Sequence, residues 1–466
     1  MEKYQVLIIG GGPGGNAAAF RLSQYGISNA TIEKEELGGV CLNWGCIPTK
    51  TLVKTAELVS EIRHSENYGL PPMDLKLDYS KILQRKNTVV EQLSKGLEHS
   101  FRKSKLAVIK ETAVSIAKED EGYIVQSREG QSYFAPYIII ATGSTPKNLP
   151  GITIDEKDIM SSRGILDMET LPKSLAIVGG GVIGCEFASI FASFGVEVTI
   201  VEFLPRLISL EDEEISKRLT LLLKRSGIKV LTKTGVESIE KAEGESILKL
   251  NNDSEIRAEK VLLAVGRTPA FGLETQGFEL AGERGAITID DSMKSSAAGI
   301  YAIGDVTAKL QLAHTASTQG ILASEQIAAE ILGKPKPTFI LDYANIPRCT
   351  FTNPEVGSVG LTEAEAKDTF GEIKISKFPF SANGKATAMA ATQGIVKCIA
   401  RKDTGTLVGM HIIGPQAAEL IAQGAIMISN NMTAASVEEI VFAHPTLSEA
   451  IMESVGELRD ITVPNK

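Results

Sequence analysis

Short apolar runs that end in glycines are the strongest pattern along the chain. Residues 6–15 read VLIIGGGPGG, and residues 175–184 read LAIVGGGVIG. Each run predicts a buried strand that leads into a G-x-G-x-x-G turn. Helical stretches follow, from Asn16 to Tyr25 and from Cys185 to Phe194. A glycine turn and a second apolar strand come next in both places, so the pattern indicates an internal repeat.

The two copies also agree further along the chain. Their second strands end in an acid, Glu33 or Glu202, with the same spacing from the last glycine of each motif. Later, residues 138–146 (IIIATGSTP) resemble residues 262–269 (LLAVGRTP). The first copy is longer, and its extra length falls mostly after Glu33, in a helix-rich stretch up to about residue 106. The pattern therefore predicts two α/β units on one plan, the first with an insertion.

The glycine motifs have the chemistry of a dinucleotide site. The first glycine of such a motif permits a tight turn, the second lets the backbone approach a pyrophosphate, and the third lets helix and strand pack closely. The helix N-terminus offers N–H groups to phosphate, and the acid accepts hydrogen bonds from a ribose diol. The alternative is a pair of glycine-rich turns without a ligand, which the matched spacing of two copies disfavours. The motif glycines are Gly10, Gly12 and Gly15, and then Gly179, Gly181 and Gly184.

Two cysteines lie inside the insertion, in the segment GGVCLNWGCIPTK at residues 38–50. Cys41 and Cys46 could bind zinc, be two unrelated buried thiols, or form a reversible disulfide. Zinc sites usually have four ligands, and no second cysteine pair or nearby histidine appears in the sequence. Five residues of ideal helix rise about 7.5 Å, whereas disulfides place their Cα atoms about 4.4–6.8 Å apart. A bridge therefore needs an irregular helical turn, for which Asn43 and Gly45 are suitable positions.

A candidate base lies near the end of the chain, in the segment FAHPTLSE at residues 442–449. Glu449 follows His444 by five positions, and Pro445 marks a turn between them. A carboxylate at this spacing could orient the imidazole and make it more basic. A structural histidine is the alternative, and the spacing by itself does not decide between the two.

Composition narrows the classes of partner. The chain has 466 residues, 43% hydrophobic and 23% charged, which is typical of a globular protein of about three domains. The net charge of −9 and the 5% aromatic content disfavour nucleic acid and anionic membranes as partners. No apolar run approaches the roughly 18 residues of a membrane span. The N-terminal residues lack the pattern of a signal peptide, so we expect a cytoplasmic protein.

The remaining cysteines also fit the expected cytoplasmic protein. Five cysteines in a chain of this length are not a disulfide framework. Cys185, Cys349 and Cys398 stand alone in apolar surroundings, so we expect them to be packed thiols.

These motifs resemble those of the FAD-dependent pyridine nucleotide–disulfide oxidoreductases that have a C-x4-C redox pair. The resemblance covers essentially the whole chain, and its specific segments are GGGPGG (10–15), GGVCLNWGCIPTK (38–50), ATGSTP (141–146), GGGVIGCE (179–186), VGRTP (265–269), IYAIGD (300–305), LAHTA (312–316) and HPTLSE (444–449). It implies an α/β fold class: two Rossmann-like dinucleotide-binding domains plus a C-terminal α+β interface (dimerisation) domain. The implied FAD-binding domain spans residues 1–147 and 276–340, the NAD-binding domain 148–275 and the interface domain 341–466.

The resemblance also implies roles for single residues. It places FAD at the first glycine motif, the flavin ribityl chain at Asp305, and the flavin ring beside Ala313 and His314. It places NAD at the second glycine motif. The implied FAD contacts are Gly10, Gly12, Pro13, Gly14, Gly15, Glu33, Lys34, Gly38, Gly39, Val40, Lys50, Ala113, Thr142, Gly143, Gly304, Asp305, Ala313 and His314. The implied NAD contacts are Gly179, Gly181, Val182, Ile183, Gly184, Glu202, Val236 and Gly266.

The catalytic groups implied by the resemblance are a disulfide, a charged pair and a base. Cys41 would exchange with substrate and Cys46 would face the flavin, with Lys50 and Glu186 as a pair beside it. His444 and Glu449 would be donated across a homodimer interface. No metal site is implied. Glu202 would repel a 2′-phosphate and Arg206 is a single cation, so NAD is favoured over NADP.

The implied reaction is oxidation of dihydrolipoamide, with FAD as carrier and NAD⁺ as acceptor. The implied partners are a lipoyl-bearing acyltransferase core or a glycine-cleavage carrier protein. The alternatives are a related NAD(P)H-dependent disulfide, quinone or metal reductase, and a non-catalytic subunit retained for assembly. Three features depart from the usual family pattern: Trp44 between the cysteines, Thr49 in place of serine, and residues 317–320 (STQG) in place of a more acidic run.

Overall fold

The computed structural model describes residues 1–459, which form two compact units. The first unit contains residues 1–51, 83–147 and 266–343, and the second contains residues 52–82, 148–265 and 344–459. The domain boundaries expected from the sequence stay a prediction, because these units follow a different division of the chain. Within residues 1–459, the structure contains no helix with the length and hydropathy of a membrane span.

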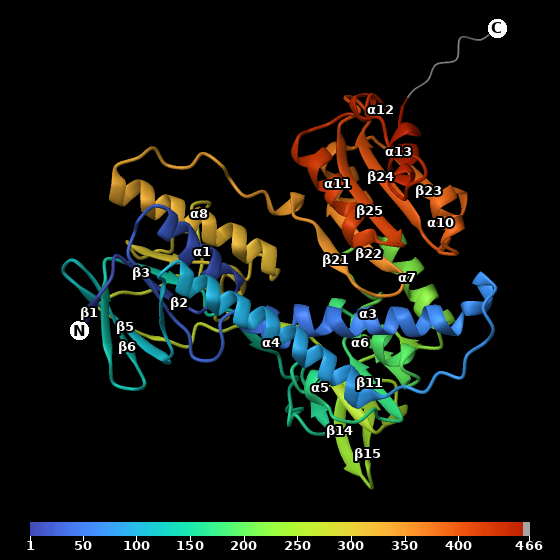
Figure 1. The fold of residues 1–466 in the computed structure, drawn as a ribbon, viewed down its shortest axis with the longest axis horizontal. Coiled ribbons are helices and arrows are strands. Elements are labelled where there is room, and N and C mark those ends of the chain that lie inside the picture. Colours follow the sequence, from blue (N-terminus) through green and yellow to red (C-terminus); the bar gives the residue numbers. More distant parts are fainter. Residues whose placement is uncertain (460–466) are drawn as a thin grey trace. The chain divides into compact units, whose positions relative to one another are not determined.

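The first unit is built on a parallel five-stranded sheet of order β20-β8-β2-β3-β4. Its central strand, β2, is apolar and buried along its whole length, which is typical of a parallel sheet covered on both faces. Helices α1 (Pro13–Gln24) and α8 (Ala313–Leu332) pack against each other beside it (Figure 1). The strands of this sheet are β2 (Val6–Ile9), β3 (Asn29–Ile32), β4 (Ala107–Ile109), β8 (Tyr137–Ile140) and β20 (Ile300–Ala302).

The second unit contains a matching parallel sheet of order β10-β17-β11-β12-β13. In both sheets the strand before the glycine motif pairs with the strand that ends in the acid, so the predicted repeat is present in the tertiary structure. The strands are β10 (Ile159–Met160), β11 (Ser174–Val178), β12 (Glu197–Val201), β13 (Lys229–Leu231) and β17 (Lys260–Leu263). The helices that accompany this sheet are α5 (Gly164–Asp167), α6 (Val182–Ser193) and α7 (Glu213–Arg225).

Each copy also has a smaller sheet, which is mixed in the first copy and antiparallel in the second. The similarity includes a short strand at each Thr-Pro turn. Those two strands, β9 (Ser144–Pro146) and β18 (Arg267–Pro269), pair with each other. The first small sheet has β1 (Glu2–Lys3), β5 (Ala113–Glu119), β6 (Gly122–Ser127), β7 (Ser132–Ala135) and β19 (Glu274–Gln276). The second has β14 (Val236–Ala242), β15 (Glu245–Leu250) and β16 (Glu255–Ala258).

The insertion of the first copy is helical, as its sequence predicts. It contains α2 (Gly39–Trp44), α3 (Cys46–Arg63) and α4 (Tyr79–Lys103), with the 3-10 turn η1 (Ser65–Tyr68) between α3 and α4. Two further 3-10 turns, η2 (Gly304–Thr307) and η3 (Tyr343–Asn345), precede and follow α8.

The C-terminal part of the chain forms an antiparallel sheet of order β21-β22-β25-β24-β23. The apolar stretches at residues 395–400 and 407–413, which are strand-like in sequence, lie within β24 and β25. Val396, Cys398 and Met410 pack in one apolar cluster with α11 and α13, whereas Lys397 and His411 alternate with them and point to the opposite face. The strands are β21 (Arg348–Thr350), β22 (Glu355–Gly360), β23 (Ile373–Pro379), β24 (Ile395–Arg401) and β25 (Leu407–Gly414).

Helices and one more 3-10 turn complete this part of the chain (Figure 1). They are α9 (Glu363–Phe370), η4 (Phe380–Ala382), α10 (Gly384–Ala388), α11 (Ala417–Ser429), α12 (Ala434–Glu438) and α13 (Glu449–Gly456).

Candidate functional site

The first glycine motif is a tight turn from β2 into α1. Gly10 has a φ of 109°, a conformation that favours glycine. A Cβ on Gly15 would lie 2.0 Å from the carbonyl oxygen of Gly10, so helix and strand approach too closely for any side chain. The helix begins at Pro13, with Gly12 as its N-cap, three residues before the expected Asn16. The reason is that proline is well suited to the first helical turn, where its missing N–H is not needed.

Glu33, the acid that follows β3, forms a hydrogen bond with the backbone of this turn. Glu33 is 8% exposed, and its two carboxylate oxygens accept hydrogen bonds from the Gly11 N–H at 2.6 Å and the Glu35 N–H at 2.8 Å. A cavity of about 330 Å³ lies beside Glu33 and is lined also by Phe101, Val108 and Lys110. Its size and its mixed apolar and charged lining fit one end of a dinucleotide.

The cysteine segment lies directly against the first glycine motif. The Gly38 N–H donates to the carbonyl oxygen of Gly11 at 2.7 Å, and a Cβ on Gly39 would lie 2.8 Å from the Cα of Gly12. This contact explains why glycines precede the first cysteine, and it places Gly38 and Gly39 against the first glycine motif, while their expected role as FAD contacts stays a prediction. Val40 is exposed, at the start of α2.

Cys41 and Cys46 form a disulfide, with their Cα atoms 4.6 Å apart. The irregularity expected for such a bridge lies at Gly45, where α2 ends and α3 begins at Cys46. Asn43 secures the turn by donating from Nδ2 to the carbonyl oxygens of Leu37 and Gly39, both at 3.0 Å. The disulfide interpretation of the pair is confirmed.

The other cysteines differ from this pair in their surroundings. Cys185 and Cys398 are fully buried, and Cys349 is half-buried rather than packed inside as expected. Burial raises the pKa of the Cys398 thiol to about 12 and raises that of Cys185 as well. Their thiolates are therefore strongly disfavoured at neutral pH.

Asp305 is held by residues from both Thr-Pro turns. The Ser144 hydroxyl donates to Asp305 Oδ2 at 2.5 Å, and Arg267 Nε donates to the Ser144 oxygen at 2.7 Å. Behind them, the fully buried Gln319 accepts from the Gly304 N–H at 2.6 Å and donates to the Tyr343 hydroxyl at 2.8 Å. The repeat between the two turns was visible in the sequence, but their mutual contact and that of Gln319 with Gly304 were not.

Two buried hydroxyls near these elements have unused hydrogen-bonding capacity. Thr142 Oγ1 and Thr315 Oγ1 have no hydrogen-bond partner among residues 1–459. Thr142 precedes Gly143 in the first Thr-Pro turn, and Thr315 follows Ala313 and His314 in the first turn of α8. Unpaired buried hydroxyls are uncommon in proteins, so both fit contact with a polar ligand along this surface.

The second glycine motif reproduces the first. Gly179 has a φ of 108°, and a Cβ on Gly184 would lie 2.0 Å from the carbonyl oxygen of Gly179. Glu202 is 8% exposed, and its carboxylate accepts from the Gly180 N–H at 2.5 Å and the Leu204 N–H at 2.6 Å. Helix α6 also begins three residues earlier than expected, at Val182 after the N-cap Gly181. The same backbone is therefore suited to a second dinucleotide, and the expected NAD contacts here stay predictions.

Arg206, the one cation near this acid in the sequence, is engaged locally. Its Nη2 donates to the carbonyl oxygen of Ser209 at 2.7 Å. Val182 is exposed and Ile183 half-buried at the start of α6, and Gly266 has a φ of 110°. The expected roles of these residues, and of Val236, Ala113 and Lys34, stay predictions.

His444 and Glu449 form the expected pair. His444 Nδ1 lies 2.8 Å from Glu449 Oε1, and Glu449 Oε2 accepts from the Thr446 N–H at 2.7 Å. The Thr446 N–H and then His444 hold the pKa of Glu449 below its usual value. A carboxylate can only accept, so Nδ1 carries the proton and Nε2 of the 79% exposed imidazole can accept one.

The other expected pair, Lys50 with Glu186, stays a prediction. Glu186 is buried in α6, where its Oε1 accepts from the Phe351 N–H at 2.9 Å. Lys50 lies in the first turns of α3 and is half-buried.

Comparisons with known proteins agree with these features. A family model described as pyridine nucleotide-disulphide oxidoreductase matches residues 4–320, and the dimerisation domain of the same family matches residues 346–455. The chain is 40% identical over 466 residues to a dihydrolipoyl dehydrogenase of Bacillus subtilis, with 97% of each chain covered. It is 39% identical over 455 residues to that of Chlamydia pneumoniae, covering 97% of this chain and 96% of the relative.

Solved structures show the same fold. The structure of LpdA from Mycobacterium tuberculosis matches with a TM-score of 0.89 at 25% identity, covering 98% of this chain and all of the other. An HOCl-induced flavoprotein disulfide reductase from Escherichia coli matches with a TM-score of 0.86 at 29% identity, with the same coverage.

Proposed function

Because the chain belongs to the pyridine nucleotide-disulphide oxidoreductase family, we propose that it is a dihydrolipoyl dehydrogenase that oxidises dihydrolipoamide and reduces NAD⁺. The curated relatives with this activity are about as long as the chain and match it nearly end to end. The observation that carries the proposal is the Cys41–Cys46 disulfide packed directly on the first glycine motif. A reversible disulfide beside a dinucleotide site is the arrangement that transfer of electrons between thiols and a flavin needs.

FAD is the proposed ligand of the first glycine motif. Glu33 would accept from its adenosine ribose, and Asp305, Thr142 and Thr315 offer polar atoms along the same surface. When bound, FAD would supply a two-electron carrier between thiols and nicotinamide. The chain's own task at this site is to hold the dinucleotide extended from Glu33 to the cysteine segment.

The thiol chemistry would be carried out by the two cysteines and the base. His444 Nε2 would take a proton from one substrate thiol, and the thiolate would attack Cys41 Sγ, which breaks the Cys41–Cys46 bond and releases the Cys46 thiolate. The second substrate thiol would then attack the substrate sulfur of the mixed disulfide, which breaks the bond to Cys41, and its proton would pass to the departing Cys41 sulfur. The substrate leaves as a cyclic disulfide, with two electrons passed to Cys41 and Cys46. Cys46 begins α3, whose N-terminal N–H groups stabilise its thiolate.

NAD⁺ is the proposed ligand of the second glycine motif. Glu202 presents a carboxylate to the ribose hydroxyls and would repel a 2′-phosphate, while Arg206 donates to Ser209. Lys50 and Glu186 are proposed to bias electron flow at the flavin. A change of 30 mV in a two-electron couple corresponds to about 1.4 kcal/mol, which is within reach of a charged pair.

The working form would be a homodimer, since residues 346–455 match the family's dimerisation domain and His444 lies in them. One subunit would supply His444 and Glu449 to the disulfide of the other. The partner would be a lipoyl-bearing acyltransferase core or a glycine-cleavage carrier protein. We place the reaction in the cytoplasm, where Cys185, Cys349 and Cys398 would stay reduced as they are here.

Anaerobic titration of the FAD-loaded enzyme tests this function. Dihydrolipoamide should produce a long-wavelength thiolate–flavin absorption band, and added NAD⁺ should then yield NADH over many turnovers. If NADH reduces the enzyme but dihydrolipoamide does not, and quinones or Cu(II) are reduced instead, the proposal is wrong and a quinone or metal reductase takes its place.

A further inference from the structure

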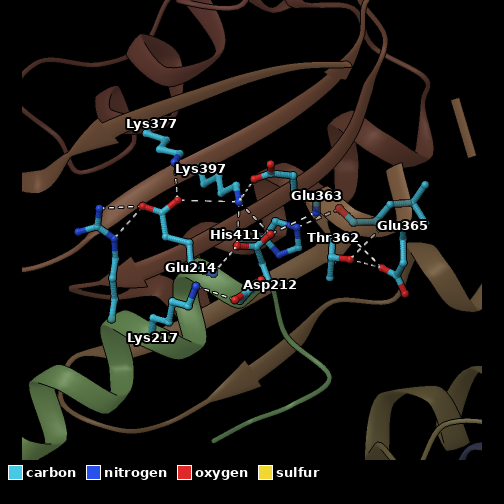
Figure 2. Close-up of polar contacts among 12 residues, drawn as sticks. Asp212, Glu214, Lys217, Thr362, Glu363, Glu365, Lys377, Lys397 and His411 are labelled. Atoms are coloured by element: carbon cyan, nitrogen blue, oxygen red, sulfur yellow. Dashed lines mark hydrogen bonds and ion pairs between the residues drawn. The ribbon is translucent and has the colours of Figure 1, made fainter. Parts of the chain in front are cut away.

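A buried ionic cluster joins the C-terminal sheet to the helix that follows Glu202. Lys397 of β24 is 1% exposed, and its Nζ lies 2.8 and 2.9 Å from the two carboxylate oxygens of Asp212, which is 2% exposed. Glu363 accepts from the same ammonium at 2.8 Å (Figure 2). Asp212 is the N-cap of α7 and accepts there from the Glu214 N–H at 3.0 Å.

The charges around the cluster keep both partners ionised. Glu214 lies 3.9 Å from Lys397 but is bound by Lys377 at 2.6 Å and by Arg218 at 2.8 Å. Burial is the largest single influence on Asp212 and would raise its pKa. The hydrogen bond and charge of Lys397, the charge of His411 and the hydrogen bond from the Glu363 N–H together outweigh it, so the pKa is lowered. Burial acts in the opposite direction on Lys397, whose pKa is nonetheless raised by Asp212 and Glu363.

A second cation of the C-terminal sheet binds the residue before Asp212. Arg348 of β21 reaches Glu211 in a fork, with Nε to Oε1 at 3.0 Å and Nη2 to Oε2 at 3.3 Å. Glu211 is 5% exposed and Arg348 is 18% exposed. Two consecutive acids are thus each held by a cation from a distant part of the chain.

These two acids end the segment that begins after Glu202, here named the Glu202 loop (residues 203–212). The loop folds back over the second glycine motif: the Ile208 N–H donates to the carbonyl oxygen of Gly180 at 2.8 Å, and the fully buried Leu207 packs against Gly180. Ile208 has a φ of 37°, which a β-branched residue adopts only where its surroundings impose it. The Gly180 N–H in turn donates to Glu202.

We infer that Arg348 and Lys397 are positioning residues for the adenosine half of NAD(H), because they hold the end of the Glu202 loop and thereby the contact of Ile208 with Gly180. The inference rests on the proposed function, which assigns NAD(H) to the second glycine motif. The chain of contacts runs from Arg348 in β21 and Lys397 in β24 to Glu211 and Asp212 at the end of the Glu202 loop. From the loop it continues to Gly180 and Glu202. The C-terminal sheet therefore influences the affinity of the second glycine motif for NAD(H), in addition to its proposed role in the contact between subunits.

The test measures NADH affinity of FAD-loaded Arg348→Lys and Arg348→Met. The lysine keeps the charge but loses the fork, and the partial exposure of Arg348 favours folding of both variants. The Kd of NADH should rise roughly 3- to 30-fold in Arg348→Met and less in Arg348→Lys. FAD content and reduction of the disulfide by dihydrolipoamide should stay as in the wild type.

A truncated ligand separates positioning from general damage. Reduced nicotinamide mononucleotide lacks the adenosine that Glu202 would bind, so its Kd should be the same in the wild type and in both variants. Lys402→Met, which removes an exposed pair with Glu372 just beyond β24, is the matched control and should leave NADH affinity unchanged.

The possible results of these binding measurements separate a failure of this inference from a failure of the proposed function. Unchanged NADH affinity in both Arg348 variants, or an equal loss for the truncated ligand, would overturn the inference while the function stands. A wild-type enzyme that binds no NADH would overturn the proposed function itself.

Discussion

Arg267 donates two hydrogen bonds to Ser144, from Nε to the hydroxyl at 2.7 Å and from Nη2 to the carbonyl oxygen at 2.6 Å. The two residues belong to the paired strands β9 and β18, which hold the two Thr-Pro turns together. The Ser144 hydroxyl, which Arg267 holds in place, donates in turn to Asp305 Oδ2. The contact thus connects the end of one repeat to the end of the other, at the acid proposed to meet the flavin.

Replacement of Ser144 by alanine should weaken FAD binding. Asp305 would lose its hydroxyl donor and Arg267 one acceptor, and a lost hydrogen bond to a charged group costs about 1.5–3 kcal/mol, roughly a 10- to 150-fold rise in Kd. Fluorescence titration of the apoprotein with FAD measures the effect. Ser292→Ala, in an exposed turn, should bind FAD normally. Equal affinities of Ser144→Ala and wild type would contradict the role of this hydroxyl.

Cys46→Ser should abolish oxidation of dihydrolipoamide while some NADH-dependent reduction of artificial electron acceptors survives. The disulfide cannot form in this variant, whereas the two glycine motifs are untouched. Both activities can be followed by NADH absorbance in one preparation. Cys349→Ser, which changes a half-buried thiol outside the bridge, should retain both. Loss of both activities in Cys46→Ser with FAD still bound would count against the assignment.

His444→Gln should lower the rate of dihydrolipoamide oxidation by about 10²- to 10⁴-fold, the usual contribution of a general base. Glu449→Gln should cause a smaller loss, because the imidazole remains but its partner at Nδ1 changes. Steady-state kcat measures both, and His99→Gln on the exposed face of α4 is the control. A His444→Gln enzyme with normal kcat would exclude this histidine as the base.

Gly184→Ala and Gly15→Ala should each disable a different cofactor site. In both variants the new Cβ would lie 2.0 Å from a carbonyl oxygen, and overpacking of this kind costs about 1–3 kcal/mol. Gly184→Ala should keep FAD and lose NADH affinity, and Gly15→Ala should lose FAD. Gly96→Ala, with open space around it in α4, should bind both cofactors. The assignment of the two motifs is wrong if the losses are exchanged.

Asp212→Asn should destabilise the protein at pH 7 by up to about 3–5 kcal/mol, because the buried Lys397 loses one of its two close carboxylates and keeps only Glu363. The pKa of Asp212 is lowered from 3.8 in the folded state, so its contribution is present above that value and lost as the pH falls below it. The pKa of Lys397 is raised from 10.5, so its contribution is lost only as the pH rises beyond that value. The cluster should therefore contribute constantly between about pH 4 and pH 10.

Thermal unfolding from pH 7 to pH 3 checks this dependence. The difference in stability between wild type and Asp212→Asn should be flat above pH 4 and shrink below it. Asp403→Asn removes an exposed pair with Arg401 and should change little at any pH. A difference that already shrinks near pH 6 would contradict the direction of the Asp212 shift.

The sequence alone determined the features that depend on local pattern. Apolar runs that end in glycines predicted the central strands and the turns after them, and the spacing of Glu33 and Glu202 placed both acids at their motifs. The pairs Cys41–Cys46 and His444–Glu449 were also within its reach, since their members are five positions apart and one turn can join them. The helix starts expected from the sequence were three residues too late. Helix α1 already begins at Pro13 after its N-cap Gly12, and α6 begins at Val182 after its N-cap Gly181.

Only the tertiary structure decided the contacts between segments far apart in the chain. No spacing or composition in the sequence predicts the contacts of Ser144 with Arg267, of Gln319 with Gly304, or of Lys397 with Asp212. Each depends on the register in which strands pair and on which face of a strand is covered. Lys397 shows the reason most clearly: its alternation with Val396 and Cys398 predicts a side chain on the other face, but only the packing of α7 on that face makes it a buried ion pair.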